Sequence, residues 1–169
     1  QNFVIVTDFQ CGDTFFVDIP APDTLKSDFI LDEPSCKGDA DGSITAEPFG
    51  GTGPYSYQWF AGPMTPNYDI LEAGDYLVRI RDANNCTFIT TVTLGEPDSM
   101  IAFIDSAFTR DITCPGAADG TIVADYMGGN TGDATYDWSP NVSNTETASP
   151  LEPGAYSVTV TDSRGCSDI

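Results

Sequence analysis

The stretch Cys36-Lys-Gly-Asp-Ala-Asp-Gly-Ser-Ile44 returns later in the chain as Cys114-Pro-Gly-Ala-Ala-Asp-Gly-Thr-Ile122. Both copies fit the pattern C-x-G-x-x-D-G-[ST]-I, and the motifs that follow them also recur in the same order. A fixed order of recurring motifs is the signature of an internal repeat, in which each copy forms one structural unit. The sequence therefore predicts tandem copies of one domain.

More pairs of segments carry the repeat. They are Gly50-Gly-Thr-Gly53 with Gly128-Gly-Asn-Thr-Gly132, Tyr57-Gln-Trp59 with Tyr136-Asp-Trp138, Leu71-Glu-Ala-Gly-Asp-Tyr76 with Leu151-Glu-Pro-Gly-Ala-Tyr156, and Val78-Arg-Ile-Arg-Asp82 with Val158-Thr-Val-Thr-Asp162. The segment from Val4 to Cys11 matches the segment from Val78 to Cys86. We therefore expect a window onto a longer array: residues 1–23 as the C-terminal part of a preceding repeat, 24–98 as a complete repeat, and 99–169 as a repeat lacking its last strand.

The pattern inside a repeat is typical of β-strands. Aromatic residues at 55, 57 and 59 alternate with polar ones, and Tyr76, Val78 and Ile80 alternate with Leu77 and Arg79. Turns rich in glycine, asparagine and aspartate separate these runs. About seven short strands in a repeat of about 75–80 residues predict an all-β fold of tandem immunoglobulin-like β-sandwiches.

Four aromatic residues sharpen this prediction. Trp59 and Trp138 follow the glycine-rich turn, where such sandwiches bury a central Trp. Tyr76 and Tyr156 close the pattern Leu-x-x-Gly-x-Tyr, which favours a tyrosine corner whose hydroxyl bonds the backbone. We predict that all four pack in the core; the alternative is a platform on which sugars stack.

Charge and composition exclude several functions. The chain has 26 Asp plus Glu against 6 Lys plus Arg, a net charge of −20, which argues against binding nucleic acid or anionic membranes. With no histidine, hydrolase triads built on that residue are excluded. The longest unbroken apolar run, Met100 to Ile104, is far too short to insert in a membrane. The 5 cysteines lack CxxC spacing and therefore suggest disulfides in a secreted or cell-surface protein.

Residues 36–86 resemble the SprB-type repeat of gliding-bacterium surface adhesins. The similarity extends from the cysteine motif through Gly50-Gly-Thr-Gly-Pro-Tyr-Ser-Tyr-Gln-Trp59 to the final cysteine, and residues 114–166 match less well. The resemblance implies a very long protein exported by type IX secretion, displayed on the cell surface and coupled to the secretion and motility machinery. It implies no catalytic residues.

Three functions are compatible with these features. The first is a structural and adhesive repeat in a stiff stalk, whose partners are neighbouring repeats and an extracellular surface or polysaccharide. The second is a carbohydrate-binding module, or a spacer of a large secreted enzyme, with Phe60, Tyr68 and Tyr126 as candidate sugar-stacking side chains. The third is a glycosidase-like enzyme with paired carboxylates. We predict the first, with no enzymatic activity and no cofactor.

The loop Gly38-Asp-Ala-Asp-Gly42 is a candidate for binding calcium. Asp39 and Asp41 resemble the start of an oxygen-rich calcium loop, but the second repeat keeps only Asp119. The preferred interpretation is a turn in which the Asp accepts backbone hydrogen bonds.

Three triplets match an O-glycosylation motif of the bacteria to which the resemblance points. They are Asp23-Thr24-Leu25, Asp98-Ser99-Met100 and Asp105-Ser106-Ala107. Thr24 and Ser99 hold the same position at the start of successive repeats. We expect glycans on Thr24, Ser99 and Ser106, and those on the first two would stiffen the joints.

The cysteines allow two pairings. Internal pairing would join Cys36 with Cys86 and Cys114 with Cys166, leaving Cys11 alone. In an immunoglobulin-like sandwich, however, Cys36 and Cys86 lie at opposite ends of the domain, whereas a disulfide needs Cα atoms about 4.4–6.8 Å apart. We favour a bond between repeats, Cys36 with Cys166, with Cys11 and Cys86 pairing upstream and Cys114 downstream.

Overall fold

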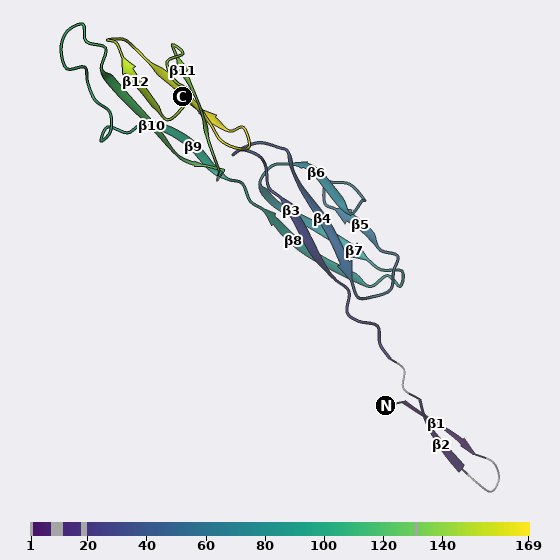
Figure 1. Ribbon diagram of the computed structural model, residues 1–169. Helices are drawn as coiled ribbons and strands as arrows, with labels where there is room; N and C mark the ends of the chain where they lie inside the picture. The colour runs from purple at the N-terminus through teal and green to yellow at the C-terminus, as the bar shows by residue number, and fades with distance from the viewer. Residues whose placement is uncertain (1, 8–11, 18–19, 131) are drawn as a thin grey trace.

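The computed structural model describes residues 2–7, 12–17, 20–130 and 132–169 (Figure 1). All regular elements in these ranges are β-strands, and none of the described residues forms a helix that could cross a membrane. Strands β1 (Asn2–Thr7) and β2 (Gly12–Val17) form an antiparallel hairpin. The other strands form two units that lie end to end in Figure 1. The all-β prediction is confirmed.

The first unit is a sandwich of two three-stranded sheets. Its strands are β3 (Lys26–Asp32), β4 (Gly42–Phe49), β5 (Ser56–Trp59), β6 (Asn67–Leu71), β7 (Gly74–Arg81) and β8 (Thr87–Leu94). The sheet orders β3-β4-β6 and β5-β7-β8 correspond to strands A, B, E and C, F, G of an immunoglobulin-like sandwich. The unit has six strands, not about seven. The segment between β5 and β6 turns back on Trp59, whose carbonyl accepts the Gly62 N–H and whose indole N–H donates to Thr65 O.

The second unit repeats this topology. Its strands are β9 (Asp98–Ile104), β10 (Gly120–Gly129), β11 (Thr135–Ser139), β12 (Thr147–Leu151), β13 (Ser157–Thr161) and β14 (Ser167–Asp168), in sheets β12-β10-β9 and β11-β13-β14. β14 pairs with β13 at two positions, whereas β8 pairs with β7 at eight. The division of the chain into 1–23, 24–98 and 99–169 stays a prediction.

Each unit has its own core, built around one tryptophan. Trp59 and Trp138 are each 2% exposed. The Trp138 indole N–H donates to Thr145 O at 2.8 Å, as Trp59 does to Thr65. Without these bonds, burial would leave the indole N–H of each tryptophan with no hydrogen-bond acceptor.

The two tyrosines lie at the edges of these cores. Tyr76 and Tyr156 are half-buried and pack against the core of their own unit. Their hydroxyls donate to Glu72 O at 2.7 Å and Glu152 O at 2.9 Å. This is the backbone bond that a tyrosine corner makes.

Candidate functional site at the junction of the two units

A disulfide joins the two units. Cys36 lies in the loop between β3 and β4, and Cys166 lies in the turn between β13 and β14. Their Cα atoms are 5.5 Å apart, within the range that disulfides need. This is the pairing between repeats that the sequence favoured over the internal one.

The internal pairing fails for a geometric reason. Gly42, which ends the Cys36 loop, lies against the Leu94 side chain at the last residue of β8. Cys86 stands immediately before the first residue of that strand, so the length of β8 separates the two cysteines. Among the described residues, Cys86 and Cys114 are free and exposed, and Cys11 lies outside the described residues.

The turn that carries Cys166 is built around a buried carboxylate. Asp162 is 6% exposed. Its Oδ1 accepts the N–H groups of Arg164 and Cys166, both at 2.9 Å, and its Oδ2 accepts the Asn130 N–H at 2.7 Å. Burial pushes the pKa of Asp162 upward, but these hydrogen bonds outweigh it and leave the pKa below its usual value.

The glycine pair of the repeat makes room for this carboxylate. Gly129 has φ +67°, and a Cβ there would lie 2.8 Å from Asp162 Oδ2. Gly51 has φ +61°, and a Cβ there would lie 2.8 Å from Asp82 Oδ2. A side chain at either position would be strained and would also collide with the acid.

The first unit contains the same arrangement around Cys86. Asp82 is 5% exposed and accepts the N–H groups of Thr52 at 3.0 Å, Asn84 at 2.9 Å and Cys86 at 2.8 Å. Burial again raises the pKa of Asp82, and the three backbone donors together lower it below the usual value. We call these two arrangements the Asp82 cradle (Gly51, Thr52, Asp82, Asn84, Cys86) and the Asp162 cradle (Gly129, Asn130, Asp162, Arg164, Cys166).

Sequence reasoning missed the role of these acids. In the sequence, Asp82 and Asp162 stand out only as matching positions of the repeat. One signal was available, because each acid ends a strand pattern and stands four residues before a cysteine. An Asp at such a place is typical of a turn whose backbone N–H groups it accepts.

The loop that carries Cys36 is fixed by two further acids. Asp41 Oδ1 accepts the Ser35 N–H at 2.8 Å, and Asp39 Oδ2 accepts the Ser35 hydroxyl at 3.2 Å. These bonds agree with the turn interpretation of Gly-Asp-Ala-Asp-Gly. No group of three or more His, Cys, Asp or Glu residues in the described ranges is placed to hold a metal ion; calcium binding at Asp39 and Asp41 stays untested.

Further contacts surround the disulfide. The Asn130 side-chain amide donates to Ser35 O at 2.8 Å, and Arg164 Nη2 donates to Glu33 O at 3.2 Å. The same guanidinium lies 3.6 Å from Asp32 Oδ1. These contacts join the Asp162 cradle to the Cys36 loop and to the end of β3, so the junction is held by covalent, hydrogen-bonding and ionic interactions.

The chain between the units joins this network. The Gly38 N–H donates to Glu96 Oε2 at 2.9 Å. Glu96 lies between β8 and β9, on the connection from the first unit to the second. The Cys36 loop is therefore fixed to the connecting segment as well as to the second unit.

The predicted glycosylation sites are all exposed, and two border the ends of units. Ser99 lines a hollow of about 360 Å³ between the units, together with Cys36 and Cys166. Thr24 lines a hollow of about 300 Å³ next to Gly50. Ser106 lies in the turn after β9. Their modification stays a prediction.

The candidate sugar-binding aromatics are not brought together. Phe60 is 52% exposed, with the Arg79 guanidinium 5.8 Å from its ring centroid. The Tyr68 ring packs 5.6 Å from Tyr76, at the edge of the first core. Tyr126 belongs to the second unit, where it is half-buried and donates to Gly132 O at 3.0 Å. Tyr126 thus packs against a different core from Tyr68.

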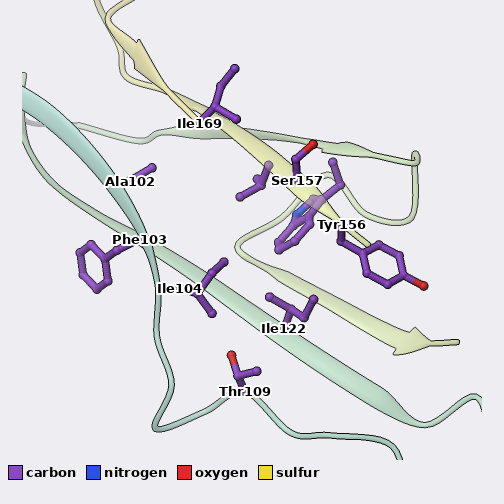
Figure 2. Close-up of a pocket in the computed structure, with 10 residues that line it drawn as sticks. Ala102, Phe103, Ile104, Thr109, Ile122, Tyr156, Ser157 and Ile169 are labelled. Atoms are coloured by element: carbon purple, nitrogen blue, oxygen red, sulfur yellow. The ribbon is translucent and has the colours of Figure 1, made fainter. Parts of the chain in front are cut away.

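A large hollow in the second unit borders its core. Figure 2 shows this hollow, about 420 Å³ in volume, with Ile104, Ile122 and Tyr156 along its wall. Its lining includes Trp138 but no Asp or Glu, so it offers no facing carboxylates for a glycosidase. In the first unit the corresponding side of the core holds Val92 and Leu94 of β8, both buried.

Comparison with known proteins finds one family match and a weak similarity to a solved structure. The family model described as "SprB repeat" matches residues 29–64, which include Cys36 and Trp59. No protein with a curated description matches the chain. One similar solved structure is the C-terminal 282-residue fragment of intimin in complex with the intimin-binding domain of the translocated intimin receptor, at 14% identity and a TM-score of 0.36, over 85% of this chain and 61% of that one. The match over residues 29–64 confirms the resemblance to the SprB repeat that was drawn from the sequence.

Proposed function

We propose that this chain is a stalk segment of a very long secreted adhesin, exported by type IX secretion and used in gliding or attachment. The observation that carries the proposal is the Cys36–Cys166 disulfide between successive units. A chain of independent domains on flexible connections bends at every joint. A bond at each joint makes the array stiff enough to hold an adhesive tip far from the cell.

The joint has two attachments, which is what resists bending. The peptide connection from β8 to β9 passes through Glu96, and the disulfide joins a loop of the first unit to a turn of the second. Glu96 also accepts the N–H of Gly38 from the Cys36 loop. With both attachments fixed, the units cannot swing freely about the connection.

The surface chemistry suits a long exposed filament. A net charge of −20 keeps neighbouring filaments apart and in solution. Glycans on Thr24 and Ser99 would add bulk at the ends of successive units, where both side chains are exposed. The stalk's partners would be other repeats, the secretion and motility machinery, and the surface or polysaccharide that the tip contacts.

Small-angle X-ray scattering of the whole chain tests the stiffness. The oxidised chain should give one narrow distribution of distances between the units, and reduction of the disulfide should broaden it towards shorter distances. Cys86→Ser is the matched control, because it removes an exposed thiol without touching the junction. Identical distributions in the oxidised and reduced chain would contradict the stalk proposal.

A second candidate, a carbohydrate-binding module, is favoured by the exposed ring of Phe60 beside Arg79. Titration with soluble polysaccharides would show binding that Phe60→Ala abolishes. Phe108 is 65% exposed and belongs to the other unit, so Phe108→Ala is the matched control. Absence of binding by the unsubstituted chain leaves the stalk as the function.

A further inference from the structure

Cys86 lies in a cradle that is already formed but has no partner loop among the described residues. The Asp82 cradle reproduces the Asp162 cradle bond for bond at the backbone: the acid accepts two N–H groups of the turn and one from the glycine-rich segment. The cysteines differ in exposure, since Cys166 is 8% exposed and Cys86 is exposed. What buries Cys166 is the loop of another unit.

Cys114 lies in the loop of the second unit that is equivalent to the Cys36 loop. Asp119 accepts the Thr113 N–H at 3.0 Å and its hydroxyl at 2.6 Å, as Asp41 accepts the Ser35 N–H. The Ala117 N–H donates to Cys114 O at 2.9 Å, as Asp39 does to Cys36 O at 3.0 Å. The loop therefore has the shape of the Cys36 loop before any partner is bound.

We propose that the Asp82 cradle and the Cys114 loop are docking surfaces for further repeats of the same kind. A Cys114-type loop of another repeat would bond to Cys86, and a cradle of another repeat would bond to Cys114. This inference rests on the proposed function as part of an array, and it identifies the surfaces through which one repeat of the array would bind the next. Each closure joins two thiols, which together give up two protons and two electrons. A disulfide oxidant, such as oxidised glutathione, takes up both and is reduced to two thiols.

The charges of these two surfaces differ from those of the closed junction. There, Arg164 of the cradle faces Asp32 of the partner unit. In the second unit Arg110 takes the position of Asp32, because it pairs with Thr121 as Asp32 pairs with Ser43. The repeat that docks on Cys114 should therefore carry an acid where Arg164 stands in this chain.

Crosslinking of the whole 169-residue chain tests the proposal. With Cys11→Ser, the free thiols of the chain are Cys86 and Cys114. High ionic strength screens the repulsion between the negatively charged copies. Oxidised glutathione is the oxidant. Peptide mass spectrometry should find Cys86–Cys114 bonds between copies at least about tenfold more often than Cys86–Cys86 or Cys114–Cys114 bonds. The reason is that docking raises the effective concentration of Cys114 near Cys86. Pairing of the cysteines in chance ratios, or glutathione adducts on both cysteines without crosslinks, would overturn it.

A matched pair of substitutions tests the charge. Asn84 is exposed and occupies the cradle position of Arg164. At low ionic strength, where this pair is not screened, Asn84→Asp puts a carboxylate opposite Arg110 and should raise the Cys86–Cys114 yield roughly threefold over the unsubstituted chain in the same buffer, and Asn84→Arg should lower it by a similar factor. Equal yields would refute the placement of Arg110. Stiffness of the internal junction is measured by scattering, so the stalk proposal stands or falls independently of this crosslink.

Discussion

The two units share a strand order but differ in how their cores are closed. In the first unit β8 runs beside β7 for eight paired residues and buries Val92 and Leu94. In the second unit β14 pairs at two positions, and a hollow of about 420 Å³ reaches Trp138. The cysteine-bearing cradle is nevertheless the same in both. The backbone hydrogen bonds of the cradle are thus the same in the unit with the longer last strand and in the unit with the shorter one.

The largest expected effect separates the two cores. Trp59→Ala should lower the free energy of unfolding of the first unit by about 3–5 kcal/mol, because it empties an enclosed core. Trp138→Ala should cost roughly 2–3 kcal/mol, because water and neighbouring side chains can enter from the adjoining hollow. Urea unfolding followed by circular dichroism measures both, and the unsubstituted unit serves as the reference. A larger loss for Trp138→Ala would show that the second core is the better enclosed.

The next effect concerns the clamp between the units. Cys36→Ser removes a bond between residues 130 positions apart and should lower the free energy of unfolding by about 2–4 kcal/mol. It should also separate the melting of the two units into distinct transitions, because their cores are separate. Calorimetry resolves this. Cys114→Ser, in the equivalent loop of the second unit, should leave the melting curve unchanged.

Acid should weaken both cradles. The pKa values of Asp82 and Asp162 are lowered on folding, so their contribution is complete above the unfolded pKa, about 3.9, and is lost as the pH falls through the folded values. Melting temperatures should therefore drop below about pH 4. Asp162→Asn should flatten this dependence in the second unit and leave that of the first unit unchanged. If the melting temperature of the variant depended on pH as steeply as that of the unsubstituted chain, the cradle would not be the source of the pH dependence.

The smallest expected effect is that of calcium on the Cys36 loop, which has Asp39 where the Cys114 loop has Ala117. If Asp39 and Asp41 fix the Cys36 loop through Ser35, calcium should not change the melting temperature of the chain. Asp41→Asn should lower the melting temperature with and without calcium alike. A calcium-dependent rise that Asp39→Asn abolishes would instead assign an ion to the first loop, where the second has Ala117.

The fold and the disulfide could be predicted from the residue pattern of a single repeat. Alternation around Trp59 and Val78 predicted the strands, and the distance between the ends of a sandwich argued against a bond from Cys36 to Cys86. The contacts that close the junction could not be predicted. Asn130 and Ser35 are 95 positions apart, and neither Asn130 nor Arg164 recurs in the first unit, which has Thr52 and Asn84. Only the three-dimensional arrangement brings them together.

The Cys36–Cys166 bond also changes what a single cut in the backbone does. The connection between β8 and β9 includes Glu96, which is exposed and therefore open to proteases. Cleavage there would leave the two fragments covalently joined, because the disulfide links residues on either side of the cut. A filament built in this way would lose its tip only when a connection is cut and its disulfide is reduced at the same joint.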